Sequence, residues 1–394
     1  MSSKPRFVGE HELVKLSEIA KIKAGNVAPK KDAFTEDGIP FVRAGSLTNL
    51  LAGGSLADLE KIDGGTASKL RLTLFPAGTV VFAKSGMSCM TGNVYVLPEP
   101  CYVVSHLACV IPNGNYASYL KHYFRFNRPN KLIENPSFPS IKLSKIQGID
   151  LRLPAPEEGV RQVQALERIE SQIEQAKKLL MHLDSLVKSR FVEMFGDPAA
   201  NTHLLPVEKL SELGLLERGK SKHRPRNAPE LRGGPDGPYP LIQTGDIANA
   251  GLYIDTYEET YTELGLQQSR MWPRGTLCIT IAANIAQTSI LAIDACFPDS
   301  VVGFTPGARI SNVFLHYWFG YFQEILEKQA PQAAQKNINL KILSNLNVIV
   351  PPLEPQGEFA AFASQVDKSR FIAQQQIEKL QMLYDSLAQD YFGD

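Results

Sequence analysis

The stretch from Gly214 to Ser221, GLLERGKS, matches the GxxxxGK(S/T) pattern of loops that bind nucleotide phosphates. Such a loop needs a strand before it and a helix after it, so that backbone N–H groups and the helix N-terminus surround the phosphates. The residues that follow, KHRPRNAPELRGGPDGP, are rich in Pro and Gly and show no helical pattern. The segment therefore predicts an exposed basic loop, which is either simply solvated or in contact with phosphates, with an ATP site as the alternative. The basic residues of this region are Lys220, Lys222, Arg224, Arg226 and Arg232.

A second stretch that suggests chemistry is NPSF, from Asn135 to Phe138. It resembles the Asn-Pro-Pro-Phe/Tyr loop with which adenine methyltransferases hold their target amino group, but the second proline is missing. No glycine-rich cofactor loop in a strand–helix–strand context precedes it. The seven histidines show no HExxH and no ligand spacing, and no GxSxG is present. The chain is therefore predicted to be non-catalytic and to hold no metal.

Composition and charge restrict the class of protein. The 394 residues suggest two or three domains, and 44% apolar with 21% charged residues is an ordinary soluble composition. The 41 basic and 41 acidic residues cancel, which argues against a free-standing, non-specific nucleic-acid binder. A binder with unevenly distributed charge, or one that shares its DNA with a basic partner, stays possible. Without a signal peptide, a membrane-length apolar run or a CxxC pair, we expect a cytoplasmic protein with buried free thiols.

The elements that would position any site occur twice along the chain. Six stretches recur in the same order at a shift of about 197 residues, which indicates a duplicated module of domain size. They are KLSEIAKIKAG (15–25) and KLSELGLLERG (209–219), GIPFVRAGSL (38–47) and PYPLIQTGDI (238–247), FPAGTVVF (75–82) and WPRGTLCI (272–279), IKLSKI (141–146) and INLKIL (338–343), LPAPE (153–157) and VPPLE (350–354), and FGD (195–197 and 392–394).

Each copy combines a mixed module with a long helix. Residues 1–153 and 198–350 contain short β-rich runs punctuated by Gly and Pro, with one clear helical patch each. Residues 154–197 and 351–394 carry apolar residues at steps of three and four, which predicts helices of about 38 residues and about 57 Å. Such a stripe is typical of a coiled-coil seam, and packing of each helix on its own module is the alternative. The stripe residues are Val163, Leu166, Ile169, Ile173, Ala176, Leu180, Leu183, Val187 and Met194, then Phe359, Phe362, Val366, Ala373, Ile377, Leu380, Leu387 and Tyr391.

Two related but different modules on paired helices suit a long, periodic target in two parts. DNA is such a target, because its major groove recurs about every 34–36 Å. We therefore expect two modules that read two short sequences with an unread spacer between them. Because the modules differ in their loops, the two half-sites differ and the target is asymmetric.

Taken together, these stretches resemble the specificity (S) subunits of type I restriction-modification systems over essentially the whole chain. The resemblance rests on the ordered duplication, on LPAPEEGVRQVQALERIE and VPPLEPQGEFAAFASQVD, and on the FGD endings. It implies an α+β fold of two tandem mixed α/β target-recognition domains, with two long helices that form an antiparallel coiled coil and a pseudo-two-fold internal repeat. The family's helices often start with Pro-Pro-Leu-x-Glu-Gln; PPLEPQGEF departs from this by an inserted Pro355, and LPAPEEGVRQ lacks the glutamine at that place.

The same resemblance implies a role in phage defence and a set of partners. A non-catalytic subunit of this kind reads double-stranded DNA, docks two adenine methyltransferase subunits and, with motor-nuclease restriction subunits, restricts unmodified DNA. S-adenosylmethionine, ATP and Mg²⁺ would belong to those partners, so this chain is expected to bind no cofactor and no membrane.

Polar residues at strand ends and in loops of each module are the candidate contacts to base edges and phosphates. Arg forks to guanine, and Asn or Gln to adenine, although each such residue is also compatible with a surface turn or a strand-end hydrogen bond. In the first module the candidates are Arg43, Ser46, Lys84, Ser85, Ser88, Asn93 and Lys142. In the second they are Gln243, Thr244, Asn284, Gln287, Gln335, Lys336 and Asn337, with Arg224 and Arg226 for phosphates.

Two other functions stay open at this point. One is a coiled-coil scaffold whose modules read no DNA. The other is a P-loop nucleotidase, which depends on GLLERGKS alone.

Overall fold

The computed structural model describes residues 12–223, 225, 228–282, 285–322, 325 and 338–393. Its contacts divide the chain into two compact units, Met1–Gln175 with Gln376–Asp394, and Ala176–Gln375. Each unit therefore contains one β-rich module and one half of each long helix. The first module spans residues 12–153 and the second spans residues 207–350.

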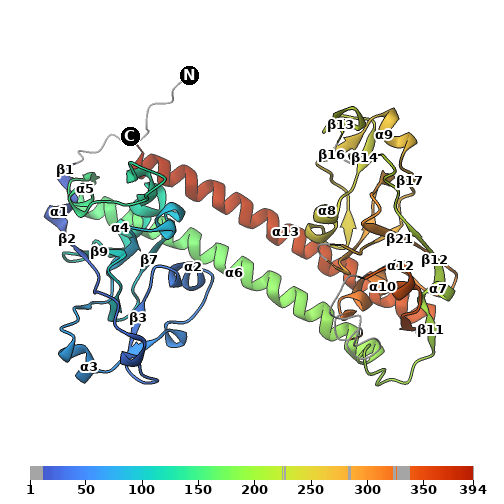
Figure 1. Ribbon diagram of the computed structural model, residues 1–394, viewed down its shortest axis with the longest axis horizontal. Helices are drawn as coiled ribbons and strands as arrows, with labels where there is room; N and C mark the ends of the chain where they lie inside the picture. Colours follow the sequence, from blue (N-terminus) through green and yellow to red (C-terminus); the bar gives the residue numbers. More distant parts are fainter. Residues whose placement is uncertain are drawn as a thin grey trace. The chain divides into compact units, whose positions relative to one another are not determined.

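The first module is built from two four-stranded sheets and a two-stranded ribbon (Figure 1). One sheet is antiparallel throughout, and the other contains one parallel pair, β3 with β8. In the antiparallel sheet the inner strand β6(Val80–Ala83) is buried along its whole length, as a Val- and Phe-rich run between two packed faces should be. The antiparallel sheet has the order β2(Ala20–Ala24), β9(Leu107–Pro112), β6(Val80–Ala83), β7(Val94–Val96); the mixed sheet has the order β4(Lys61–Ile62), β3(Ile39–Val42), β8(Cys101–Val103), β5(Leu74–Phe75); the ribbon pairs β1(Glu12–Lys15) with β10(Asp150–Leu153).

The second module repeats this strand order and adds one edge strand to each sheet. β14(Tyr239–Leu241) and β20(Ala295–Cys296) form the parallel pair that corresponds to β3 and β8, and the added strand β15(Tyr253–Ile254) pairs in parallel with β19(Thr288–Leu291). The sheet that corresponds to the antiparallel sheet has the order β12(Gly214–Arg218), β21(Val301–Pro306), β18(Leu277–Thr280), β19(Thr288–Leu291), β15(Tyr253–Ile254). The sheet that corresponds to the mixed sheet has the order β13(Arg232–Gly234), β16(Glu259–Tyr261), β14(Tyr239–Leu241), β20(Ala295–Cys296), β17(Met271–Trp272). The ribbon pairs β11(Val207–Lys209) with β22(Asn347–Ile349). The added edge strands are β15, beside β19, and β13, beside β16. The predicted internal repeat is thus confirmed at the level of topology.

One turn shows how the repeated sequence produces the repeated fold. FPAGT and WPRGT both place a glycine in the left-handed region, with φ +81° at Gly78 and +87° at Gly275. The N–H of Gly78 donates to Leu97 O at 2.8 Å, and the N–H of Gly275 donates to Leu291 O at 2.7 Å. Any other residue would be strained at these two positions, so both copies require glycine to enter β6 or β18.

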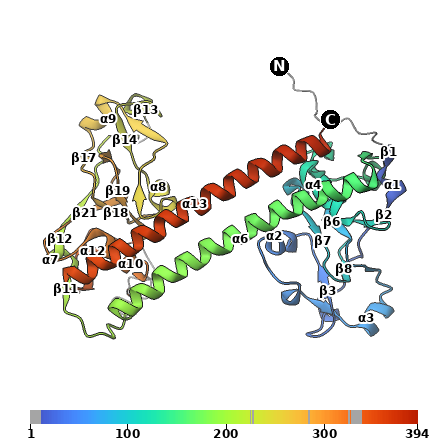
Figure 2. The same ribbon diagram turned by 180° about the vertical axis from the view of Figure 1, so that it is seen from behind.

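Short helices connect and cover the strands. In each module one helix, α4(Ala117–Phe126) or α10(Asn312–Phe319), packs between the long helices and the sheet that contains β6 or β18 (Figures 1 and 2). In the first module the helices are α1(Leu16–Ile19), α2(Ser46–Leu51), α3(Gly64–Lys69), α4(Ala117–Phe126) and α5(Leu143–Gln147), with the 3-10 turns η1(Lys31–Ala33), η2(Leu56–Asp58), η3(Met87–Thr91) and η4(Pro129–Leu132). In the second they are α7(Leu210–Leu213), α8(Thr244–Asn249), α9(Glu263–Gln267), α10(Asn312–Phe319) and α12(Leu340–Ser344), with η5(Pro229–Leu231).

The two long helices, α6(Pro156–Phe195) and α13(Leu353–Phe392), have 40 residues each. In the first unit the beginning of α6 and the end of α13 share one hydrophobic cluster; in the second unit the end of α6 and the beginning of α13 do so. Within each unit the helices are therefore antiparallel (Figure 2). In the second unit Arg370 Nη1 lies 3.2 Å from Asp184 Oδ1 across the pair.

The long helices pack on the modules as well as on each other, so both predicted packing modes occur. In the second unit Phe191 and Phe195 of α6 contact Phe314 of α10, with ring centroids 5.3 and 5.0 Å apart, and Phe191 also meets Phe359 of α13 at 5.3 Å. The apolar stripe predicted from the sequence omits these two α6 phenylalanines. Both rings contact Phe359 of α13 as well as Phe314 of α10, so they lie where the helix pair meets the module.

Gln356 anchors the beginning of α13 to the second module. Its side chain is buried; Nε2 donates to Pro351 O at 2.8 Å and to Arg309 O at 3.0 Å, and Oε1 accepts from Ser311 N–H at 2.8 Å. The inserted Pro355 precedes it as the third residue of the helix, where the backbone N–H has no helical partner, so the proline breaks no hydrogen bond.

We expect Gln356→Ala to lower the free energy of unfolding by about 2–4 kcal/mol, because it leaves three buried backbone groups without a partner. Chemical denaturation followed by circular dichroism measures this. Gln375→Ala, at an exposed position of the same helix, serves as the control and should change stability by less than about 0.5 kcal/mol. Equal effects of the two substitutions would contradict the anchoring role.

A polar cluster joins α4 of the first module to both long helices. His122 is fully buried, and its Nδ1 lies 2.8 Å from the hydroxyl of Tyr384 on α13. Lys121 and Arg125, on the same turn of α4, form ion pairs with Glu170 of α6. Burial lowers the pKa of His122 to about 4, although the nearby Glu170 carboxylate acts in the opposite direction. The imidazole is therefore neutral in the folded protein at neutral pH.

This cluster predicts a loss of stability in mild acid. Because the pKa of His122 is about 4 in the folded state and about 6.5 when unfolded, protons bind the unfolded chain better between these values. Stability should fall as pH decreases from about 6.5 to 4, with a contribution from His122 of up to about 3 kcal/mol. Urea unfolding of wild type and His122→Gln across this range tests it. The variant should show a shallower dependence on pH, and parallel curves would contradict the assignment.

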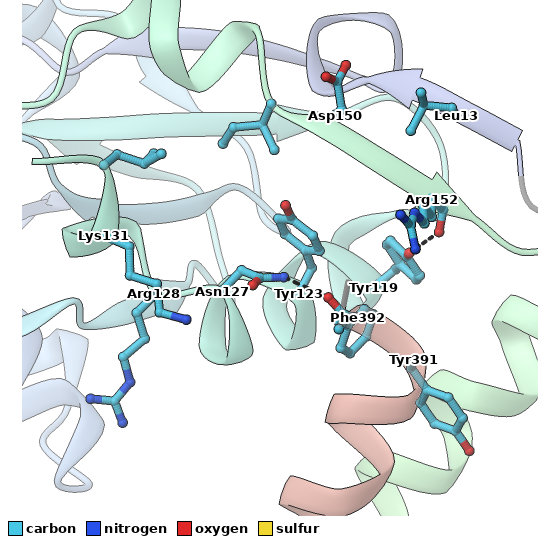
Figure 3. Close-up of a pocket in the computed structure, with 13 residues that line it drawn as sticks. Leu13, Tyr119, Tyr123, Asn127, Arg128, Lys131, Asp150, Arg152, Tyr391 and Phe392 are labelled. Atoms are coloured by element: carbon cyan, nitrogen blue, oxygen red, sulfur yellow. Dashed lines mark hydrogen bonds between the residues drawn. The ribbon is translucent and has the colours of Figure 1, made fainter. Parts of the chain in front are cut away.

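The end of α13 docks against α4 beside a cavity of about 350 Å³ (Figure 3). The ring of Phe392 lies edge-on to Tyr119 with centroids 5.3 Å apart, and its carbonyl accepts from Asn127 Nδ2 at 3.1 Å. The Tyr119 hydroxyl donates to Arg152 O at 3.0 Å. Figure 3 shows the guanidinium of Arg128 directed away from this group. The contacts hold the helix end in place and do not converge on a ligand.

The structure also bears on the predicted thiols. All five cysteines are free and buried, as expected, and burial raises the pKa of Cys101 to about 12. The described residues include no group of three or more His, Cys, Asp or Glu placed to hold a metal ion. Among the described helices, none combines the length and apolarity needed to cross a bilayer.

Candidate nucleic-acid interface

In the first module, the strand end after β3 supplies the first predicted contacts. Arg43 follows β3, and its carbonyl accepts from the N–H of Ser46, which begins α2, at 3.0 Å. Two residues further on, Thr48 Oγ1 accepts from Asn93 Nδ2 at 3.2 Å. The start of α2 is thereby joined to the segment just before β7, so Ser46 and Asn93 lie in one region.

The loop after β6 joins the remaining candidates to this region. Ser85 Oγ lies 2.9 Å from Nδ1 of His106, and Lys84 O accepts from Ile141 N–H at 2.7 Å, which places Lys142 beside the loop. The 3-10 turn η3, which carries Ser88, continues from this loop towards Asn93. The structure therefore brings all seven candidates of the first module into one continuous strip. We call this set the β6 strip: Arg43, Ser46, Lys84, Ser85, Ser88, Asn93 and Lys142.

The cations of the β6 strip are not equivalent. Arg43 Nε lies 2.6 Å from Glu60 Oε2, and its guanidinium also stacks 5.2 Å from the centroid of Phe34. Lys84 and Lys142 form no ion pair with any described residue. Lys142 lies near enough to Glu134 to help lower the pKa of that carboxyl, but neither lysine is held in a direct ion pair. Two such ammonium groups on adjoining segments suit binding of phosphates, whereas Arg43 is already paired with Glu60.

The second module places its candidates at the equivalent strand ends. Gln243 precedes α8 and its N–H donates to Asp246 Oδ2 at 2.7 Å, while its side chain lines a cavity of about 180 Å³ with Arg232 and Tyr261. Thr244 is the first residue of α8. Gln287 is exposed at the β18–β19 hairpin, where its N–H donates to Thr280 Oγ1 at 3.0 Å. α8, which Thr244 begins, packs against β18 and β19, the two strands that the Gln287 hairpin joins.

Six candidates of the second module lie outside the described residues. They are Arg224, Arg226, Asn284, Gln335, Lys336 and Asn337.

The phosphate-loop interpretation of GLLERGKS is wrong. Gly214–Arg218 is strand β12, and the N–H of Gly219 donates to Val301 O at 2.8 Å within the sheet. A Cβ at Gly219 would lie 2.3 Å from Pro298 O, so this glycine serves a close approach of two backbones. No helix begins within residues 219–223, so the N–H cradle of a nucleotide site does not form there.

NPSF adopts a turn rather than a methyltransferase loop. Phe138 N–H donates to Asn135 O at 3.2 Å, and Ser137 N–H donates to the side-chain Oδ1 of Asn135 at 3.0 Å. The amide oxygen of Asn135 is thus occupied by its own turn and does not face a ligand.

Comparison with known proteins decides the family. A family model described as "Type I restriction modification DNA specificity domain" matches residues 9–183 and matches again over residues 208–382. This chain belongs to that family. The predicted family is confirmed, and it is one of DNA-recognition domains rather than of enzymes.

Individual relatives agree with this membership. The type I restriction enzyme MjaIX specificity subunit of Methanocaldococcus jannaschii is 24% identical over 148 residues, which are 36% of this chain and 34% of that protein. The match therefore spans about a third of the relative's length. A crystal structure of a type I S subunit from M. genitalium covers 100% of this chain and 98% of its own, with TM-score 0.62 and 13% identity. A second structure, from work on assembly and conformational transition of the type I system, covers 98% of both chains with TM-score 0.53 and 16% identity.

At these identities the two solved structures show the fold alone. They support the predicted architecture of two tandem mixed modules with two long antiparallel helices. They do not identify which residues of this specificity-domain chain touch bases.

Two residues that support the β6 strip were missed by reasoning from the sequence. Thr48 holds Asn93, and His106 holds Ser85. Neither belongs to a motif, and their partners are 45 and 21 residues away in the chain, so no local pattern marks them.

The charges of the β6 strip predict different salt dependences of DNA binding. We expect Lys84→Ala and Lys142→Ala each to reduce the slope of log affinity against log salt by about 0.9, the effect of one lost phosphate contact. Arg43→Ala should change the slope by less than half as much, because Glu60 already neutralises Arg43. DNA titrations of the assembled complex at several salt concentrations measure these slopes.

Lys69→Ala, in the last turn of α3, is the control and should leave the slope unchanged. Equal slopes for wild type and all three β6-strip variants would show that the strip does not contact phosphates.

Proposed function

We propose that this chain is the non-catalytic DNA specificity subunit of a type I restriction-modification complex, and that it reads a bipartite, asymmetric target with an unread spacer. One observation carries the proposal. Two modules of the same strand order, each matched by the specificity-domain model, present different polar side chains at equivalent strand ends. A duplicated framework with different loops is what reading of two different half-sites requires.

The differences between the modules support an asymmetric target. The region after β3 begins α2 with Ser46, whereas the region after β14 begins α8 with Thr244. The second module also carries the additional edge strands β13 and β15. Because the donors and acceptors presented to a groove differ, the two modules should select different bases.

The proposed partners are two adenine methyltransferase subunits and motor-nuclease restriction subunits, in the cytoplasm, where they protect against phage DNA. S-adenosylmethionine, ATP and Mg²⁺ would be bound by those subunits, and this chain would bind no cofactor. Exposed apolar side chains on the long helices support protein docking. Phe371 and Ile372 of α13 are each 64% exposed, and large apolar side chains in such positions mark interaction surfaces.

Methylation mapping tests the function directly. The chain is co-expressed with the methyltransferase of its own system, and the methylated adenines of the host DNA are sequenced. We expect one split, non-palindromic sequence with two defined halves and a spacer of fixed length. Substitution of Lys84 and Ser85 by Ala should weaken methylation through the first half-site, whereas Gln287→Ala should act through the other half.

Two results would contradict the proposal. A chain that never associates with the methyltransferase would not be its specificity subunit. A chain that associates with it but yields no sequence-dependent methylation would be a scaffold, and its modules would not read DNA.

A further inference from the structure

Phe138, the last residue of NPSF, is an aromatic side chain displayed to solvent on a constrained turn. It is 80% exposed. The turn is closed by the Phe138 N–H to Asn135 O bond and by the Ser137 N–H to Asn135 Oδ1 bond, and prolines stand at positions 136 and 139. These bonds and prolines restrict the backbone that carries the ring, so little backbone entropy is lost on binding.

The turn is fixed to the β6 strip. Gly86 N–H donates to Pro139 O at 3.1 Å, and Ser85 forms a backbone bridge with Ser140. The next residue after Gly86 is Met87, which is 75% exposed and begins η3. Met90 is also exposed, and in a 3-10 turn residues three apart lie on the same side. An apolar projection of Phe138, Met87 and Met90 therefore stands at the β6 strip.

Two lysines stand together at the base of this projection, because Lys84 O accepts from Ile141 N–H at 2.7 Å and Lys142 is the next residue. Lys84 lies two residues before Gly86, and Lys142 lies three residues after Pro139; neither is paired with an acid among the described residues. An apolar projection beside two lysines that form no ion pair is unusual for the centre of a protein–protein contact, where lysine is depleted. It is typical of proteins that insert an apolar side chain between base steps while cations hold the phosphates.

We propose that Phe138, supported by Met87, is an apolar wedge that contacts the bases of the half-site read by the first module. This inference rests on the proposed function and adds to it a second way of reading DNA, through the stacking and deformability of base steps rather than through hydrogen bonds. Phe138 contributes a ring face to the bases, and Lys84 and Lys142 hold the flanking phosphates.

The wedge has a signature that a phosphate contact lacks. A side chain without charge releases no counterions, so its removal weakens binding without changing the salt dependence. Loss of one aromatic–base contact reduces affinity by about 10- to 100-fold. Partial unstacking of a base step also changes the environment of a fluorescent base analogue placed at that step.

The experiment uses the full chain assembled with its methyltransferase and a duplex that contains the mapped target. Affinity is measured at several salt concentrations for wild type, Phe138→Ala, Met87→Ala and Val27→Ala. Val27 is 82% exposed in the same module and serves as the matched control. We expect Phe138→Ala to bind at least about 10-fold more weakly with an unchanged salt slope, Met87→Ala to show a smaller loss, and Val27→Ala to match wild type.

A second measurement uses the same duplex with 2-aminopurine substituted at successive positions of the first half-site. Wild type should increase the fluorescence at one step, and Phe138→Ala should not. Because the side chain is exposed, the variant should keep the unfolding midpoint of wild type, which separates loss of the wedge from loss of folding.

Three results would overturn the wedge. If Phe138→Ala binds the duplex as tightly as Val27→Ala does, the ring does not contact bases, while specific methylation by wild type still supports the proposed function. If Phe138→Ala instead reduces the amount of methyltransferase that co-purifies, the ring is a protein contact. If wild type itself shows no sequence-dependent methylation, the proposed function fails and the wedge with it.

Discussion

Burial of the two long helices is the constraint on which both modules depend. Each helix has 40 residues and only a narrow set of apolar positions, so most of its surface must stay in water. Leu166 of α6 and Tyr384 of α13 enter the core of the first module, and Phe191 of α6 and Phe359 of α13 enter the core of the second. Each such burial contributes about 1.5–3 kcal/mol, which neither helix gains alone. A module with only one of the helices would leave part of its core exposed.

This shared core separates the framework from the reading surface. The central strands β6 and β18 are buried along their whole length, and their sequences, VVFA and LCIT, differ without changing the strand order. The segments that leave these strands carry no such packing constraint. Side chains at the ends of β6 and β18 can therefore differ between the modules while the framework remains the same.

The balance of charge also has a structural basis. A chain with no net charge has no general attraction for DNA, yet many of its ions are used internally. Glu170 binds Lys121 and Arg125, and Glu60 neutralises Arg43. Lys84 and Lys142 are two of several described lysines that form no ion pair, and these two stand together at the β6 strip. Local placement of the charges, rather than their sum, supports a contact with phosphates at this surface.

The sequence by itself determined the duplication, the two long helices, the mixed character of the modules and the family. These features depend on local periodicity, on turn residues such as Gly78 and Gly275, and on order along the chain, all of which can be read without knowledge of contacts. Only the tertiary structure decided that each module packs against one end of each long helix, and that Gly214–Arg218 of GLLERGKS is a strand. Only the tertiary structure showed that the ring of Phe138 is exposed beside the loop that follows β6. His122 and Tyr384 are in contact although they are 262 residues apart in the chain. Ser85, after β6, contacts His106, which lies 21 residues later and just before the neighbouring strand β9. These contacts depend on how segments that are distant in the sequence pack together, and a local sequence pattern does not specify which distant segment a residue will contact.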